Sequence, residues 1–176
     1  MLKIDILIGL PGSGKSTWSR KEVERLSRNK RRAVIINKDS IRTMLAGKYM
    51  YDESIEPIVS DAIRDILFIV INRNCSVGKI IIDETHITRK KREALLWNIS
   101  RAALDLSGES IQVRYVWFTE SDKCYHNRMK NSRGICGTKW LDVINNMKEA
   151  FERPTLKESS GDIVDLRPAS IKRVAI

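Results

Sequence analysis

The sequence predicts an α/β fold, a three-layer sandwich in which helices cover both faces of a mainly parallel central sheet. Apolar runs that suit buried parallel strands recur along the chain, and segments with helical periodicity lie between them. A glycine-rich turn follows directly after the first of these runs. Ligands in such folds gather at the carboxyl ends of the strands, so the residues that follow each strand are the first candidates for function.

We expect one domain over residues 1–176, because this length is sufficient to bury a core without disulfides or structural metal. The expected strands are residues 2–8, 33–37, 79–83, 111–118 and, more weakly, 163–166. The expected helices are residues 16–28, 55–74, 88–106, 119–130 and 137–151, with Thr88 and Thr119 as N-caps of the third and fourth. A C-terminal strand and tail then occupy about residues 162–176.

The segment GLPGSGKSTW, residues 9–18, matches the P-loop pattern G-x-x-x-x-G-K-[ST] at Gly9, Gly14, Lys15 and Ser16. The pattern requires a buried strand before it and a helix after it, and both flanks have the matching periodicity. Its glycines let the backbone turn so that successive N–H groups point inward, and the helix adds the positive end of its dipole. The segment therefore predicts a triphosphate site, against the alternative of a glycine-rich turn without a ligand.

ATP and Mg²⁺ are the expected cofactors of this site. Lys15 is expected to reach the β and γ phosphates as a point charge, and the Ser16 hydroxyl is an expected Mg²⁺ ligand. The residues expected to hold the nucleotide are Gly12, Ser13, Gly14, Lys15, Ser16 and Thr17. A donor other than ATP stays open.

The chain is strongly basic, with 32 Lys and Arg against 22 Asp and Glu and a net charge of +10. The basic residues gather in two clusters, at residues 20–32 and 88–92. This balance favours a polyanionic partner such as nucleic acid. Solvated helix faces are the alternative for each cluster.

The cysteines and the apolar runs argue against several classes of protein. Three cysteines without a C-x-x-C pair argue against a zinc site or a disulfide framework. The longest uncharged apolar run, residues 66–71, is far too short to cross a bilayer, so no membrane partner is expected. We therefore expect a soluble, cytoplasmic protein.

Asp39 and Arg42 follow the second expected strand and lie one helical turn apart, on the same face. A carboxylate at this position is suited to orient an acceptor hydroxyl and take its proton during in-line attack, as in kinases. The alternative is that Asp39 caps a helix and Arg42 is a surface residue.

Asp83 and Glu84 end the third expected strand, which runs IIIDETH. One of them is expected to order the Mg²⁺ shell. Asp83 is the preferred candidate because it ends the strand directly, whereas Glu84 is placed to face the acceptor. His86 follows in the same loop, where packing or positioning is the favoured interpretation.

Arg128 and Arg133 lie in the segment RMKNSRG, at the end of an expected helix and in the turn after it. An arginine that reaches over the triphosphate would stabilise charge that develops in the transition state. Ordinary helix C-terminal charge is the alternative for both.

These segments together resemble the 5′-kinase domain of phage polynucleotide kinase and its P-loop kinase relatives. The resemblance rests on GLPGSGKSTW, INKDSIR, IIIDETHITRKKR and RMKNSRG, and it runs over most of the chain. It implies a P-loop kinase fold with a helical lid at about residues 128–138. It also implies phage origin, action in the host cytoplasm and a place in nucleic acid repair.

The resemblance further implies roles for individual residues. Lys15 and Ser16 hold the nucleotide and metal, Asp39 is the general base, Arg42 contacts the acceptor phosphate, and Arg133 contacts the donor phosphates from the lid, with Arg128 as its alternative. The choice between Asp83 and Glu84 as the metal-ordering acid stays open.

The leading hypothesis is a polynucleotide 5′-kinase, an ATP-dependent phosphotransferase that moves the γ-phosphate of ATP to a free 5′-hydroxyl of DNA or RNA. One alternative is a P-loop kinase for a nucleoside, sugar or antibiotic hydroxyl. Another is an ATP-hydrolysing regulatory module without an acceptor. The sequence leaves DNA against RNA, single strand against duplex end, and the oligomeric state open.

Overall fold

A computed structural model describes residues 1–48, 51–73, 77–104, 111–119, 137–155, 158, 163–167 and 170–173. The strands are β1 (Leu2–Ile8), β2 (Arg32–Ile36), β3 (Val77–Ile82), β4 (Ile111–Phe118), β5 (Ile163–Arg167) and β6 (Ser170–Arg173). The helices are α1 (Lys15–Arg28), α2 (Lys38–Ala46), α3 (Glu56–Asn72), α4 (Arg89–Ala103) and α6 (Gly137–Glu149).

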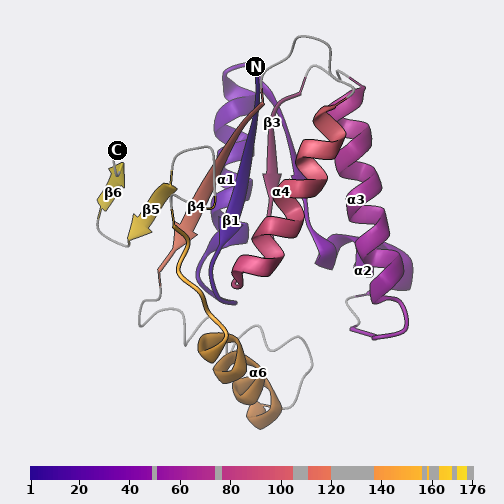
Figure 1. Cartoon of the computed structure of the whole chain (residues 1–176), viewed down its shortest axis with the longest axis vertical. Coiled ribbons are helices and arrows are strands. Elements are labelled where there is room, and N and C mark those ends of the chain that lie inside the picture. Colours follow the sequence, from indigo (N-terminus) through magenta and orange to yellow (C-terminus); the bar gives the residue numbers. More distant parts are fainter. Residues whose placement is uncertain are drawn as a thin grey trace.

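The strands form one six-stranded sheet in the order β2-β3-β1-β4-β5-β6 (Figure 1). β1 to β5 are parallel to their neighbours, and β6 pairs antiparallel with β5. β1 lies between β3 and β4, with Ile6 opposite both Ile82 and Tyr115. The P-loop after β1 therefore lies beside the loop that follows β3.

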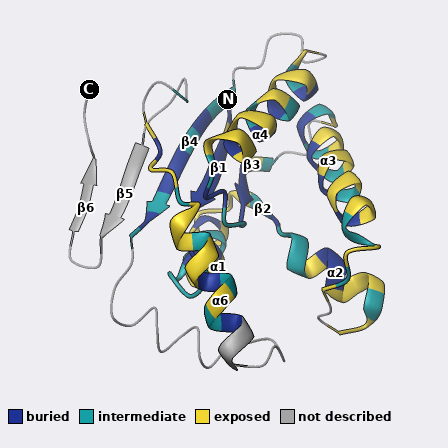
Figure 2. Cartoon of the chain, turned by 60° about the horizontal axis from the view of Figure 1, so that its bottom comes forward, coloured by how far each residue is buried: buried dark blue, intermediate teal, exposed yellow. Residues whose placement is uncertain are grey.

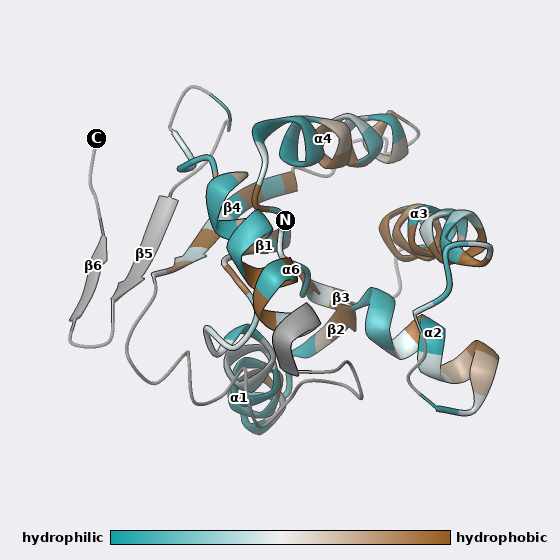
Figure 3. Cartoon of the chain, turned by 90° about the horizontal axis from the view of Figure 1, so that it is seen from below, coloured by the Kyte–Doolittle hydropathy of each residue, from teal (hydrophilic) through white to brown (hydrophobic). Residues whose placement is uncertain are grey.

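Helices cover both faces of the sheet, with α1 on one side and α3 and α4 on the other (Figure 3). The central strands β1, β3 and β4 are largely buried (Figure 2). Along β1, Ile4 and Ile6 face α3 and α4 and join a large apolar cluster with Val59 and Leu95. Leu7 faces α1 in a smaller cluster. This alternation follows from the two-residue period of a strand.

The structure confirms the expected α/β sandwich with a mainly parallel sheet. Thr88 caps α4 by accepting a hydrogen bond from the Lys91 N–H, as expected. The expected strand at residues 163–166 is β5, and β6 lies within the C-terminal tail. The expected helix at residues 119–130 and most of the expected lid at 128–138 lie outside the described residues. Among the described helices, none combines the length and apolar character needed to span a bilayer.

A buried ionic network lies between the sheet and α1. Asp5 in β1 accepts hydrogen bonds from Lys79 in β3 at 2.9 Å and from Arg114 in β4 at 2.6 and 2.8 Å. Lys79 also donates to Glu22 of α1 at 2.8 Å. Hydrogen bonds from Arg25 outweigh the burial of Glu22 and, together with Lys79, lower the pKa of Glu22 to about 2. The network joins three strands to the helix that begins at the P-loop.

We expect Asp5→Asn to lower the free energy of unfolding by about 3 kcal/mol, because it removes the buried carboxylate that the buried Lys79 and the partly exposed Arg114 share. Urea denaturation at neutral pH measures this change. Glu24→Gln, which removes an exposed ion pair with Arg28 on the same helix, is the control and should change stability little. Equal stability of the two variants would show that the network contributes nothing.

Candidate active site

The P-loop has the backbone geometry that a phosphate cradle requires. Gly12 and Gly14 have positive φ values of 76° and 95°, and Gly14 is the N-cap of α1. Gly9, with φ 154°, has no room for a side chain, since a Cβ there would lie 2.9 Å from the Phe118 carbonyl oxygen. The loop thus ends at the N-terminus of a 14-residue helix, where backbone N–H groups favour an anion.

Lys15 lies folded over the loop and is buried. Its ammonium group donates to the carbonyl oxygens of Gly9 and Leu10 at 2.8 and 2.9 Å, and it lies 3.4 Å from the Ser13 hydroxyl. These contacts hold the charge of Lys15 within the concave side of the loop. The P-loop, the N-terminus of α1 and Lys15 together fit the phosphates of a nucleoside triphosphate.

Two contacts attach β1 and the P-loop that follows it to the segment after β3. The Gly9 N–H donates to the Thr85 carbonyl oxygen at 3.0 Å. The His86 Nδ1 lies 3.1 Å from the Leu7 carbonyl oxygen, and burial lowers the pKa of His86 to about 4. His86 is therefore a neutral, buried side chain at neutral pH, and its position agrees with a role in packing and positioning.

The end of β3 separates two acidic side chains. Asp83 is 4% exposed, and its carboxylate accepts a hydrogen bond from Ser19 of α1 at 3.1 Å, on the P-loop side. Asn37 donates to the Asp83 carbonyl oxygen at 2.6 Å and also caps α2. Glu84 instead lines a cavity on the side of α3 and α4. The two neighbouring acids thus face different parts of the site.

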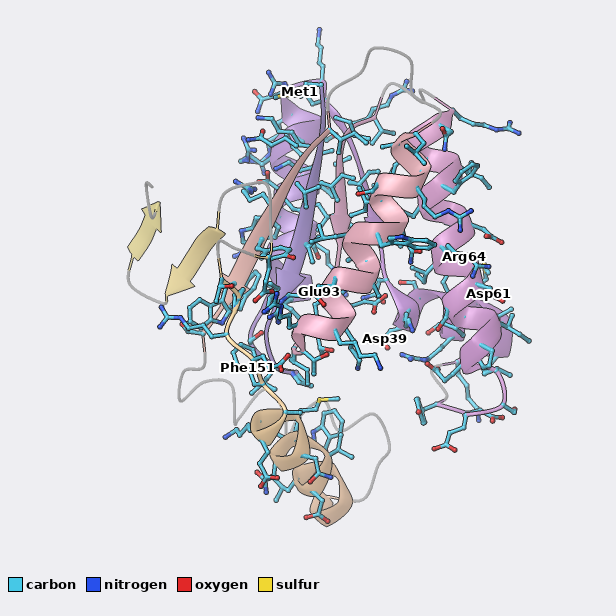
Figure 4. The ribbon with its side chains drawn as sticks, in the orientation of Figure 1. Met1, Asp39, Asp61, Arg64, Glu93 and Phe151 are labelled. Carbon is cyan, nitrogen blue, oxygen red and sulfur yellow. The ribbon has the colours of Figure 1, made fainter. Side chains whose placement is uncertain are left out.

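Asp39 and Arg42 lie on α2 and are in contact, as their spacing predicts. Arg42 donates to Asp39 at 2.6 Å, and its Nε and Nη2 donate to both carboxylate oxygens of Glu56 at 2.6 and 2.7 Å. Asn37 is the N-cap of this helix, so Asp39 is not the cap. Figure 4 shows Asp39 near the lower end of the sheet, where the parallel strands end. Arg42 is a buried link between two carboxylates and not a surface residue.

A cavity of about 250 Å³ lies between α3 and α4 at the end of β3. Its polar lining residues are Lys38, Ser60, Arg64, Glu84, Lys91 and Asn98. Burial raises the pKa of Glu84, while the charges of Lys38 and Arg42 lower it and that of Asp39 raises it. Lys38, the first residue of α2 and the neighbour of Asp39 in the chain, lines the cavity, so the cavity lies next to the helix that carries Asp39 and Arg42.

The oxygen ligands available at this site fit a Mg²⁺ ion that is bound together with a nucleotide. The part of the chain that the structure describes contains no cluster of three His, Cys, Asp or Glu side chains, the arrangement of an all-protein metal cage. Mg²⁺ usually takes one or two protein ligands and completes its shell with phosphate oxygens and water. Ser16 in the first turn of α1 and Asp83 at the end of β3 supply hard oxygen donors of this kind.

Arg128 and Arg133 lie outside the described residues, so the expected lid arginines have no described position. Sequence reasoning missed Ser19 and Glu56. Ser19 lies three residues after Ser16, on the same helix face, and this spacing is a usable signal. Glu56 begins a separate helix, and nothing in its neighbourhood indicates that it pairs with Arg42.

The raised pKa of Glu84 predicts a pH-dependent effect of Glu84→Gln. Glu84 ionises near 4.5 in the unfolded chain and at a higher pH in the folded one, so folding stability is lost as pH rises through that interval. The glutamine side chain of the variant does not ionise, so its folding stability does not fall in this way. Its advantage in Tm over the wild type should therefore grow from about pH 4 to pH 8, whereas the exposed Glu53→Gln should show no such trend. A constant difference would contradict this prediction.

Comparison with known proteins agrees with this geometry. The sequence matches the family model described as an AAA domain over residues 5–154. No curated protein matches it. A fungal RNA kinase structure is similar with TM-score 0.66 and 11% identity, over 99% of this chain and 78% of that one.

Two further structures have similar folds. The Mycobacterium tuberculosis APS kinase CysC, in complex with AMPPNP and APS, has TM-score 0.64 and 16% identity, over 96% of this chain and 90% of that one. A chain of the Pnkp1/Rnl/Hen1 RNA repair complex has TM-score 0.59 and 22% identity, over 90% of this chain and 50% of that one. These similarities establish a P-loop kinase fold, and the match over residues 5–154 shows that the chain belongs to the AAA domain family.

Proposed function

We propose that the protein is a polynucleotide 5′-hydroxyl kinase that uses ATP and Mg²⁺. The observation that carries the proposal is the position of the cavity, which Lys38 of α2 lines next to Asp39 in the chain, across the end of β3 from the P-loop. A phosphoryl donor and a hydroxyl acceptor need to meet at such a junction, because phosphoryl transfer depends on positioning and charge stabilisation.

On the donor side, the P-loop residues from Gly12 to Thr17 bind the phosphates. Lys15 supplies positive charge near the β and γ phosphates, and Ser16 and Asp83 hold the metal. ATP supplies the phosphoryl group, and Mg²⁺ offsets negative charge on it. Ser19 holds the Asp83 carboxylate in place through its hydrogen bond.

On the acceptor side, Asp39 orients the 5′-hydroxyl and takes its proton as the oxygen attacks. Arg42 binds a phosphate of the acceptor while it holds Asp39, and Glu56 fixes the plane of its guanidinium. Lys38 and Lys91 add positive charge at the cavity. Arg133, or Arg128 in its place, is proposed to stabilise the transferring phosphoryl group from the lid.

Charge favours a nucleic acid acceptor. The net charge of +10 suits a polyanion, and two of the similar structures are described as an RNA kinase and an RNA repair complex. In the first basic cluster, Arg25 and Arg28 pair with glutamates of their own helix, on the face of the sheet opposite the cavity. The cations at the cavity are therefore more relevant to the acceptor than that cluster.

A small-molecule kinase is the second candidate, and one observation favours it. The cavity volume of about 250 Å³ is below the usual range for drug-sized ligand sites, so it is compatible with a compact acceptor. The similar APS kinase also acts on a small molecule. A steep loss of acceptor affinity between low and moderate salt would favour a polynucleotide, since such binding releases counterions.

The proposal predicts transfer of label from [γ-³²P]ATP to a short oligonucleotide with a free 5′-hydroxyl, and none to its 5′-phosphorylated counterpart. Asp39→Asn should lower turnover by about 10² or more while ATP binding persists, because a positioned base contributes at least this much. Asp61→Asn, which changes an exposed aspartate of α3, should retain turnover.

Near-normal turnover of Asp39→Asn would defeat its assignment as the base. If no DNA or RNA end is labelled although ATP still binds, the acceptor is a small molecule and the second candidate function is favoured. Release of phosphate to water without any labelled acceptor would instead favour an ATP-hydrolysing module.

A further inference from the structure

Trp97 of α4 is exposed, unlike the other three tryptophans of the chain. Its exposed fraction is 59%. The others are packed: Trp18 against Phe118, Trp117 against Phe151, and Trp140 in a buried position. A single exposed apolar side chain needs no function by itself. The surroundings of Trp97 are what distinguish it.

Arg101 lies one turn further along α4, with its guanidinium 4.8 Å from the centroid of the Trp97 ring. This cation–π contact restrains the indole and places the guanidinium over one face of the ring, so a base would stack on the opposite face. Proteins that bind single-stranded nucleic acid use the same pair of features, an aromatic face for a base and a nearby cation for the backbone.

The position of Trp97 on α4 connects it with the cavity. Lys91 and Asn98 line the cavity. At 100° per residue, Lys90, Glu93, Trp97 and Arg101 form a stripe directly beside that lining face. Trp97 lies about 9 Å along the helix from Lys91, at a rise of 1.5 Å per residue. This distance corresponds to the next one or two nucleotides of a strand whose first nucleotide lies in the cavity.

The charge of α4 suits a polyanion along this stripe. The helix has one acidic residue, Glu93, and Arg89 pairs with it at 2.7 Å. Arg92 is fully buried and pairs with Glu158, so it is not part of the exposed surface. Lys90, Lys91 and Arg101 are exposed and leave a net positive face around Trp97.

We propose that Trp97 and Arg101 form a stacking platform for a base of the acceptor strand, at the second or third nucleotide from the 5′ end. The inference rests on the proposed function, since it places the terminal nucleotide in the cavity beside Asp39. It assigns the acceptor as single-stranded nucleic acid at this position, because a paired base has no accessible face to stack on the indole.

Steady-state kinetics with two acceptors tests the platform. The acceptors are thymidine 3′-monophosphate, which ends before Trp97, and a single-stranded oligothymidylate ten-mer with a free 5′-hydroxyl. In Trp97→Ala, the KM for the ten-mer divided by the KM for the monophosphate should rise about tenfold, the lower range of base–aromatic stacking. Trp97→Phe should restore most of the wild-type ratio. Ile69→Ala, an exposed apolar change on the far face of α3, should leave the ratio unchanged.

A binding measurement that needs no catalysis separates the platform from the proposed function. The ten-mer should quench tryptophan fluorescence in the wild type and not in Trp97→Phe, and an abasic site at both the second and third positions should abolish the quenching. Quenching without phosphorylation of any 5′ end would support the platform and overturn the kinase proposal. Phosphorylation with an unchanged KM ratio, or no quenching by the ten-mer, would overturn the platform and leave the surface to another class of partner.

Discussion

The hydrogen bond from the Gly9 N–H to the Thr85 carbonyl oxygen joins the two loops on which the site depends. It is available because β1 and β3 are adjacent parallel strands that end at the same edge of the sheet. Gly9 lacks a Cβ, and a side chain there would collide with the β4 backbone. The phosphate cradle and the acidic residues after β3 are thereby held in one rigid unit.

Neighbouring residues at the end of β3 then serve the two halves of the site. Asp83 faces Ser19 and the helix that begins at the P-loop, whereas Glu84 faces the cavity between α3 and α4. Asn37 bonds to the Asp83 backbone and caps α2, which sets Asp39 beside the same strand end. The buried Arg92 donates to the carbonyl oxygens of His86, in the loop after β3, and of Glu152, after α6. It therefore joins the segment after α6 to the loop after β3.

Local patterns explain how much of this was predictable from the sequence. The strands, the P-loop and the Asp39–Arg42 contact follow from periodicity and short fixed spacings, and the structure agrees with each. Pairing between distant segments has no such signal, which is why Glu56 was missed as a partner of Arg42. Asp5, Lys79 and Arg114 did carry a signal, because each is a charged residue within a mostly apolar strand. Arg92 was grouped with the basic surface, although tertiary packing buries it against Glu158.

We propose that the end of β3 divides the donor side from the acceptor side, with Asp83 on the metal side and Glu84 on the other. Calorimetric titration of ATP at a series of Mg²⁺ concentrations tests it directly, in the wild type, Asp83→Asn and Glu84→Gln. We expect Asp83→Asn to raise the Mg²⁺ concentration for half-maximal ATP affinity by about tenfold, the lower end of the effect of removing groups around a metal. Glu84→Gln should keep the wild-type requirement. A raised requirement in Glu84→Gln, with none in Asp83→Asn, would contradict the account.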